Sequence, residues 1–173
     1  MKVLVEIKAR CEDLESKEEV LRRLGAEYVG TLTQDDTYFR VPRGRLKLRV
    51  EDGDASLVYY LRPDERRPKV SRVLVARVLD PDAVREILAA VLGVGVRVRK
   101  VRRVYMWEGV RVHLDRVEGL GTFLEFELVT DERGVEEGRE RLRRLMEVLG
   151  IGDNDLIAHS YSDLLAQGPS GGG

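Results

Sequence analysis

Apolar and polar residues alternate along most of the chain, and this period of two is the pattern of half-buried β-strands. In the first such stretch, Val3, Val5 and Ile7 fall on one face, whereas Glu6 and Lys8 fall on the opposite face. The same alternation predicts seven further strands, at about 34–41, 44–51, 55–62, 70–79, 96–107, 110–117 and 121–129. The pattern therefore predicts a chain built largely from short, mostly antiparallel strands.

Four stretches follow helical spacing instead. The first begins near Ser16, which is followed three residues later by a glutamate in the manner of a capping box, and it ends at Gly25. The second spans about 82–92, and the last two span about 132–149 and 153–165. Apolar residues recur along one side of these stretches, so we expect amphipathic helices that cover strands.

The predicted elements occur in the same order twice: a strand, a helix and then three strands, with no linker between the two copies. Eight short strands in 173 residues predict one α+β domain whose sheet closes into a barrel or packs as a sandwich. We expect this domain to cover residues 1–166. The glycine-rich segment 167–173 has nothing to bury and is predicted to be a disordered tail.

Composition and charge exclude several classes of protein. The chain is 43% hydrophobic and carries 30 Lys and Arg against 31 Asp and Glu, which argues against disorder and against a uniformly basic surface. Any anion site must therefore come from local segregation of charge. A nucleic-acid binder is accordingly not favoured. The many Glu and Arg residues and the few side-chain amides resemble the composition of a thermophile's protein.

The sequence gives no sign of a membrane segment or of export. No apolar run approaches the roughly 18 residues that a membrane span requires. The stretch Met1–Glu6 reaches an acidic residue too early for a signal peptide, and the single cysteine, Cys11, cannot form an internal disulfide. A cytoplasmic protein is therefore expected.

The polar faces of the predicted strands are charged in register. Residues that share such faces are Glu6, Lys8 and Arg10; Arg45, Lys47 and Arg49; Lys100 and Arg102; Arg111, His113 and Asp115; and Glu125 and Glu127, with Arg62 and Arg72 on the strands between. In one interpretation these faces form the solvated exterior of an ordinary sheet. In the other they line a barrel whose apolar exterior is covered by helices. So many enclosed cations would require water or a polyanion such as adjacent phosphates, and the carboxylates could hold a hard divalent cation. Alternation and composition do not choose between the two.

An ordered set of motifs distinguishes between these two interpretations. These motifs are, in chain order, Val5-Glu6-Ile7-Lys8, Gln34-Asp35-Asp36-Thr37-Tyr38-Phe39, Leu46-Lys47-Leu48-Arg49, Tyr60-Leu61-Arg62, Ser71-Arg72, Lys100-Val101-Arg102-Arg103-Val104-Tyr105, Val112-His113-Leu114-Asp115, Gly119-Leu120-Gly121-Thr122-Phe123-Leu124-Glu125-Phe126-Glu127 and His159-Ser160-Tyr161-Ser162-Asp163-Leu164-Leu165. From Val3 to Leu165 the chain resembles the CYTH family of triphosphate tunnel metalloenzymes, which includes class IV adenylate cyclases and thiamine triphosphatases. The last motif is similar to the cyclase-type branch. The resemblance implies an eight-stranded antiparallel closed β-barrel, a triphosphate tunnel lined by charge with helices packed outside.

The resemblance also implies an enzyme that depends on Mg²⁺ or Mn²⁺ and acts on ATP or another triphosphate or polyphosphate. The cyclase version forms cyclic AMP and pyrophosphate from ATP, and the alternative is a triphosphatase acting on tripolyphosphate, a nucleoside triphosphate or thiamine triphosphate. The residues implied to bind phosphate are Lys47, Arg49, Arg62, Arg72, Lys100, Arg102 and Arg111. Those implied to hold the metal are Glu6, Asp115, Glu125 and Glu127, and Lys8 and Lys100 are the candidate catalytic residues. Family members often form dimers, and the apolar outer strands would permit a homodimer.

Two departures from the family pattern affect these expectations. Leu4 stands where family members usually carry the first glutamate of Glu-x-Glu-x-Lys, and the residues after Arg72 lack the acids that are frequent there. These departures would weaken metal binding, move the metal onto the remaining carboxylates, or reduce the number of metal sites. A third hypothesis, a non-catalytic polyphosphate- or nucleotide-binding protein, therefore stays open.

Other residues are expected to have structural roles. His113 is expected to be a hydrogen-bonded tunnel residue and His159 a surface or packing residue of the last helix. Cys11 is expected to be a spectator because no histidine lies near it in the sequence. Tyr105 and Trp107 are expected to pack against helices. Asp35 and Asp36 are expected to have a turn or similar structural role.

Overall fold

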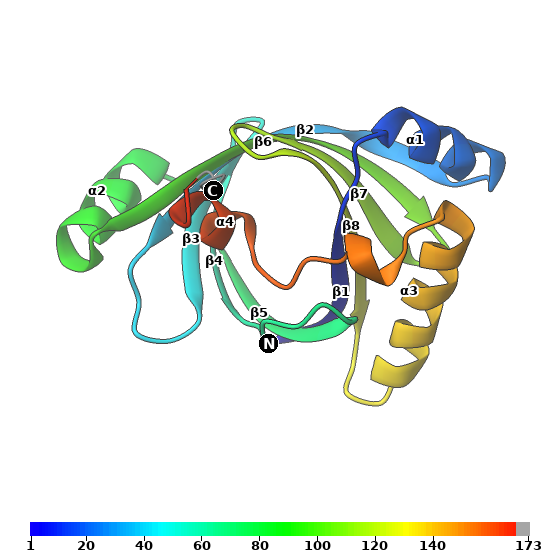
Figure 1. Ribbon diagram of the computed structural model, residues 1–173. Coiled ribbons are helices and arrows are strands. Elements are labelled where there is room, and N and C mark those ends of the chain that lie inside the picture. The colour runs from blue at the N-terminus through cyan, green and yellow to red at the C-terminus, as the bar shows by residue number, and fades with distance from the viewer. Residues whose placement is uncertain (169–173) are drawn as a thin grey trace, which may run out of the picture.

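Eight antiparallel strands close into a barrel in the computed structural model, which describes residues 1–168 (Figure 1). The strands are β1 (Lys2–Arg10), β2 (Glu27–Phe39), β3 (Arg45–Glu51), β4 (Asp54–Leu61), β5 (Lys69–Arg77), β6 (Val94–Trp107), β7 (Val110–Val117) and β8 (Gly121–Thr130). Around the barrel they run in the order β1-β5-β4-β3-β2-β6-β7-β8, and β8 pairs with β1 to close it. The barrel expected from the sequence is confirmed.

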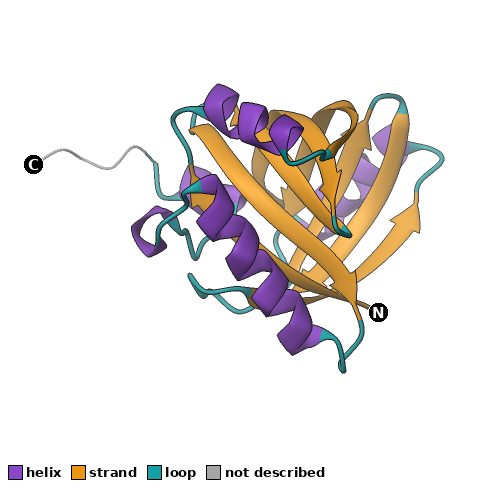
Figure 2. Cartoon of the chain, turned by 90° about the vertical axis from the view of Figure 1, so that its right-hand side faces the viewer, coloured by secondary structure: helices purple, strands orange, loops and turns teal. Residues whose placement is uncertain are grey.

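The helices lie outside the strands. They are α1 (Leu14–Arg23), α2 (Pro81–Leu92), α3 (Val135–Leu149) and α4 (Tyr161–Ala166), with a short 3-10 helix at Asp153–Asp155. The order β1-α1-β2-β3-β4 followed by β5-α2-β6-β7-β8 confirms the predicted duplication. Figure 2 shows α1 and α3 against the same side of the barrel.

The main hydrophobic core lies between α1, α3 and the outer faces of β1, β7 and β8. Leu142, Leu145, Met146 and Leu149 form the apolar stripe of α3 and are all buried, as helical spacing predicts. Each buried aliphatic side chain of this kind contributes about 1.5–3 kcal/mol. Helix α3 approaches the barrel closely at Gly138, where an added Cβ would lie 3.1 Å from side-chain atoms of both Val5 and Leu128. By contrast, α2 has no buried residue.

Several element boundaries differ from the sequence prediction, among them the start of α3, which is Val135 instead of about residue 132. Helix α1 begins at Leu14 and is capped by Asp13, whose carboxylate accepts a hydrogen bond from the Ser16 amide at 3.0 Å. Strand β2 begins at Glu27, well before the expected start near residue 34, because it pairs with β6 along most of its length. The register of that pairing shifts between Tyr28 and Gly30, and this bulge interrupts the alternation.

The predicted helix 153–165 is wrong. Only its ends are helical, and residues 156–160, which we call the strap, cross one end of the barrel between α3 and α4 (Figure 1). The strap is held by backbone pairing that a sequence pattern cannot reveal: Leu156 bridges to Ala9, and the Ile157 amide donates to the Lys8 carbonyl at 2.9 Å. His159 is an exposed residue of the strap.

Residues 169–173, which make up most of the predicted disordered tail, lie outside the described residues. Within residues 1–168, no helix combines the length and the apolar character needed to cross a membrane.

Candidate active site

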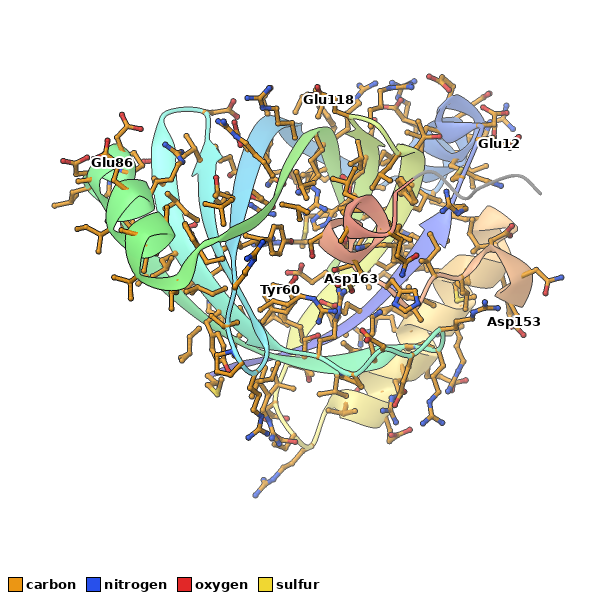
Figure 3. All side chains as sticks on the ribbon, turned by 60° about the vertical axis from the view of Figure 1, so that its left-hand side comes forward. Glu12, Tyr60, Glu86, Glu118, Asp153 and Asp163 are labelled. Carbon is orange, nitrogen blue, oxygen red and sulfur yellow. The ribbon has the colours of Figure 1, made fainter. Side chains whose placement is uncertain are left out.

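The charged strand faces point into the barrel, around a cavity of about 1000 Å³. Predicted site residues that line it are Glu6, Lys8, Lys47, Arg49, Arg62, Lys100, Arg102, Arg111, Glu125 and Glu127. In Figure 3, Tyr60 lies among charged side chains of the interior, whereas Glu12 and Glu86 lie at the periphery. The tunnel interpretation of the alternation is therefore the correct one.

One wall of the cavity gathers three cations on a single carboxylate. Asp36 is fully buried in β2 and accepts hydrogen bonds from Lys47 Nζ at 3.0 Å, from Arg49 Nε and Nη2 at 2.8 and 2.7 Å, and from Lys100 Nζ at 3.1 Å. Burial alone would raise the pKa of Asp36, but the three cations outweigh it and hold the pKa well below its ordinary range. Asp36 thus lies within a strand, not in a turn, and it positions three candidate phosphate ligands.

Lys100 and Lys8, the candidate catalytic lysines, are both buried. Burial lowers the pKa of Lys100 well below its ordinary value, with Asp36 opposing the shift and nearby arginines adding to it. Burial also lowers the pKa of Lys8 to about 8, opposed by Glu125, whose Oε2 lies 3.7 Å from Lys8 Nζ. Both ammonium groups are therefore poorly solvated and suited to binding an anion.

The next two strands after β6 around the barrel carry a cluster of metal-ligating side chains. His113 of β7 and Glu125 and Glu127 of β8 offer ligand atoms that all lie within 4.8 Å of one another. His113 lines the tunnel as expected, and its buried Nδ1 lies 3.7 Å from Glu125 Oε1 without a hydrogen-bond partner among the described residues. Two carboxylates suit Mg²⁺ or Mn²⁺, and an imidazole beside them is acceptable to Mn²⁺. These three residues fit a divalent cation.

The other two predicted metal ligands lie outside this cluster because arginines bind them. Glu6 Oε1 accepts from Arg62 Nη1 at 2.7 Å. Asp115 accepts two hydrogen bonds from Arg102, both at 2.7 Å, and a third from the Tyr161 hydroxyl at 2.6 Å. Burial would raise the pKa of Asp115, but Arg102 lowers it below its ordinary value. In this arrangement Asp115 positions Arg102.

The predicted placement of Arg72 in the tunnel is wrong. Its side chain is 57% exposed and pairs with Glu132 at 3.0 Å on the outer surface. The inward positions of β5 are the alternate ones, among them Lys69 and Ser71, which lie opposite Glu6 and Leu4 of β1. Arg45, also expected in the tunnel, does not line this cavity and instead pairs with Asp163 of α4.

Sequence reasoning missed several interior residues. Lys69 is almost completely buried, and its Nζ donates to the carbonyl of Ala158 in the strap at 2.8 Å. Burial lowers the pKa of Lys69 to about 8. Tyr161 lines the cavity, although it belongs to a motif already noticed. Tyr38 and Tyr60 meet across the interior with their hydroxyl oxygens 3.4 Å apart, and burial raises the pKa of Tyr38 to about 12. The inward position of Lys69 could have been predicted from the sequence, because Lys69 and Ser71 are two residues apart and therefore share a face of the strand.

Leu4 belongs to an apolar part of the cavity. Inward residues there, besides Leu4, are Leu32, Val73, Val104, Met106 and Val129. In the β1–β8 ladder Leu4 is opposite Val129, Glu6 is opposite Glu127 and Lys8 is opposite Glu125. Along β1 the cavity therefore has an apolar level at Leu4, between Lys2 at the rim and the charged interior at Glu6 and Lys8.

Comparisons with known proteins agree with this architecture. “Putative adenylate cyclase MJ0240” of Methanocaldococcus jannaschii is 28% identical over 169 residues, which cover 92% of this chain and 97% of that protein. “Adenylate cyclase CyaB” of Aeromonas hydrophila is 26% identical over 175 residues, with coverage of 94% and 88%. The solved structure of the PH1012 protein of Pyrococcus horikoshii superposes with a TM-score of 0.85 at 28% identity, covering 95% of this chain and 99% of that one. The CYTH domain matches residues 2–161. The chain belongs to the CYTH family.

Proposed function

We propose that the protein is a divalent-metal-dependent enzyme that converts ATP bound in the barrel to cyclic AMP and pyrophosphate. The observation that carries the proposal is that two neighbouring groups line one cavity: the cations around Asp36 on β3, β2 and β6, and the cluster of His113, Glu125 and Glu127 on β7 and β8. The names of the two curated relatives support a cyclase. The single, buried cysteine, Cys11, is in keeping with a cytoplasmic enzyme.

The cations would bind the phosphate chain. Lys47, Arg49 and Lys100 share one carboxylate, so their wall keeps an excess of positive charge in a poorly solvated place. Arginine presents N–H groups that match phosphate oxygens, and fixed donors of this kind stabilise charge that develops on a leaving phosphate. Arg62 adds two buried donor atoms, Nε and Nη2, that lack partners among the described residues.

The metal would be held by Glu125, Glu127 and His113. When bound, a divalent cation supplies Lewis-acid polarisation of a phosphoryl oxygen and neutralises its charge. Arg102 stays close to the same cluster, with Nη2 3.4 Å from Glu125 Oε2, and is oriented by Asp115. A phosphate bound beside Arg102 would therefore contact both groups.

In the proposed reaction the 3′-oxygen of the ribose attacks the α-phosphorus and forms the new P–O bond. The bond from the α-phosphorus to its bridging oxygen breaks, and pyrophosphate leaves with the electron pair. The 3′-hydroxyl proton passes to solvent water, and protonated Lys8, which lies beside Tyr161 at the strap end of the cavity, would bind the terminal phosphate. Lys100 and the arginines would stabilise the pyrophosphate.

A triphosphatase is the second candidate. In that reaction a water oxygen attacks the terminal phosphorus, the bridging P–O bond breaks, and phosphate is released while water gives up a proton. Leu4 lowers the capacity of the site for a second metal ion in either reaction, so it does not distinguish the two candidates. A structure from Hippeastrum with the same fold, 21% identical with a TM-score of 0.64, has a name that ascribes a dominant triphosphatase activity to that protein.

A substrate panel tests both candidates. Purified protein is given ATP, GTP, thiamine triphosphate or tripolyphosphate with Mg²⁺ or Mn²⁺, and cyclic nucleotide, pyrophosphate and phosphate are measured. Cyclic AMP with pyrophosphate would support the cyclase, and phosphate without cyclic product the triphosphatase. Binding of tripolyphosphate without turnover at any metal would leave the non-catalytic hypothesis. The Arg72→Gln variant is the matched control for Lys100→Met, since Arg72 faces the exterior.

A further inference from the structure

Tyr161, the first residue of α4, is built into the wall of the cavity. Its side chain is almost fully buried, and its ring centre lies 3.7 Å from Lys8 Nζ and 5.7 Å from Lys100 Nζ. The ring also packs on Phe123 with a centroid distance of 5.0 Å. An aromatic ring from the carboxy-terminal helix thus occupies the space beside both candidate catalytic lysines.

Contacts from several elements hold this ring in place. The Tyr161 hydroxyl donates to Asp115 at 2.6 Å. The preceding Ser160 caps α4 by accepting from the Asp163 amide at 3.2 Å, and Lys69 holds the strap through the Ala158 carbonyl. Since the strap crosses this end of the barrel (Figure 1), the ring cannot withdraw without breaking these contacts.

The other end of the cavity opens to solvent. Val29, Val75 and Val129 line it, each more than half exposed, and Lys2, Asp54 and Arg77 lie at its rim. A triphosphate ester entering there would leave its organic part among apolar residues and send its phosphates toward Lys8. The charged end is the end that Tyr161 closes.

The β1–β8 ladder provides a scale along this path. The pairs Leu4–Val129, Glu6–Glu127 and Lys8–Glu125 follow one another two residues apart, a rise of about 7 Å per step. The apolar pair, the first carboxylate pair and the pair beside Tyr161 therefore form successive levels. A phosphate chain that stops at the Tyr161 level has a fixed alignment with Glu125 and Glu127.

We propose that Tyr161 is the end stop of the phosphate chain and thereby determines how long a chain the site accepts in its productive position. The inference rests on the proposed function, because it assumes that phosphates occupy the cavity. With the ring present, one additional phosphate pushes the nucleoside outward, away from the apolar level. With the ring removed, the longer chain moves inward and regains that position. Tyr161 is in this sense a specificity-determining residue.

The test compares ATP with adenosine 5′-tetraphosphate, which differs by one phosphate. Affinities are measured by calorimetry without metal, and kcat/KM with Mn²⁺, for wild type, Tyr161→Phe, Tyr161→Leu and Tyr161→Ala. We expect the preference for ATP over the tetraphosphate to fall by about tenfold in Tyr161→Ala and by less in Tyr161→Leu. Tyr161→Phe retains the ring and should keep the wild-type preference. The graded series keeps the proposal testable if the alanine variant does not fold.

His159→Ala is the matched control, because His159 is an exposed residue of the same strap and does not line the cavity. An equal loss for both nucleotides in Tyr161→Ala, or the same change of preference in His159→Ala, would overturn the end stop. If wild type binds both nucleotides but turns over neither, the proposed enzyme is refuted, and the affinity ratios still decide the role of Tyr161. If wild type binds neither nucleotide, both proposals fail.

Discussion

The two copies of the strand–helix–three-strand unit have one topology but line the barrel with different chemistry. The first copy contributes Asp36 with Lys47 and Arg49, whereas the second contributes the cluster of His113, Glu125 and Glu127. Their helices differ as well, since α1 buries core residues and α2 buries none. The barrel is a scaffold in which inward positions can change while the outward positions keep the fold.

The two copies also differ in whether their interior carboxylates have cationic partners. Asp36 in the first copy is surrounded by three cations, whereas Glu127 in the second forms no ion pair with any residue in 1–168. Removing a buried carboxylate leaves its partner cations uncompensated and is therefore costly, whereas a carboxylate without such partners is available to a ligand. Removing the two should therefore have different consequences.

The largest effect on stability is expected from Asp36→Asn. The substitution leaves Lys47, Arg49 and Lys100 without their shared anion, and breaking a buried charge group in this way costs about 3–5 kcal/mol. Urea unfolding measures the loss, and added tripolyphosphate should restore part of it by binding the folded state. A free energy of unfolding within about 1 kcal/mol of wild type would show that the cations do not depend on Asp36.

Glu127→Gln should have the reverse profile. Its stability should stay within about 0.5–1 kcal/mol of wild type, since no cation loses its partner. Metal-dependent turnover should fall by about a hundredfold or more, and Mn²⁺ should bind more weakly in a titration without substrate. Glu132→Gln, on the outer surface, is the control. Unchanged Mn²⁺ affinity in Glu127→Gln would remove Glu127 from the metal site.

The contrast between the copies also explains what the sequence could predict. Regular alternation in β1, β6 and β7 indicated which side chains share a face, and the family resemblance placed that face, with Lys8, Lys100 and Arg102, inside the barrel. In β5 both faces carry apolar residues, and the pattern did not reveal that Lys69 faces inward while Arg72 faces outward. Where the two faces of a strand differ little in polarity, the pairing register with neighbouring strands determines which face points inward. That register depends on residues far away in the sequence.

Pairing between distant side chains set the other limit. In the sequence Glu6 and Glu127 are both acids on inward strand faces. In the fold, Glu6 is bound by Arg62, which follows β4 directly and lies 56 residues away in the chain. Asp115 is likewise bound by Arg102 and by Tyr161 of α4. Which carboxylates stay available to a metal thus depends on contacts that exist only in the folded barrel.

Lys100→Met tests the cationic wall, with Arg72→Gln as its counterpart outside the barrel. Loss of one charged hydrogen-bond donor should cost about 1.5–3 kcal/mol, which is about 10- to 100-fold in tripolyphosphate affinity. Arg72→Gln should bind as wild type does within about twofold, because Arg72 pairs with Glu132 on the outer surface. Calorimetric titration in metal-free buffer measures both. Equal losses in the two variants would mean that the affinity reflects overall charge.

The smallest expected effect is a dependence of affinity on pH that comes from Lys8. Burial lowers the pKa of Lys8 from 10.5 to about 8, so its ammonium group loses its proton above that pH and anion binding weakens. Tripolyphosphate affinity should fall by up to about tenfold per pH unit through this range, relative to Lys8→Met. The comparison between the two proteins cancels the titration of the ligand itself. If the two proteins showed the same pH dependence of affinity, Lys8 would not contact the phosphates.

The stability of the fold should change in the opposite direction, because between about pH 8 and 10.5 the unfolded chain holds the Lys8 proton that the folded chain has released. A rise in pH through this window therefore favours the folded state while it weakens anion binding.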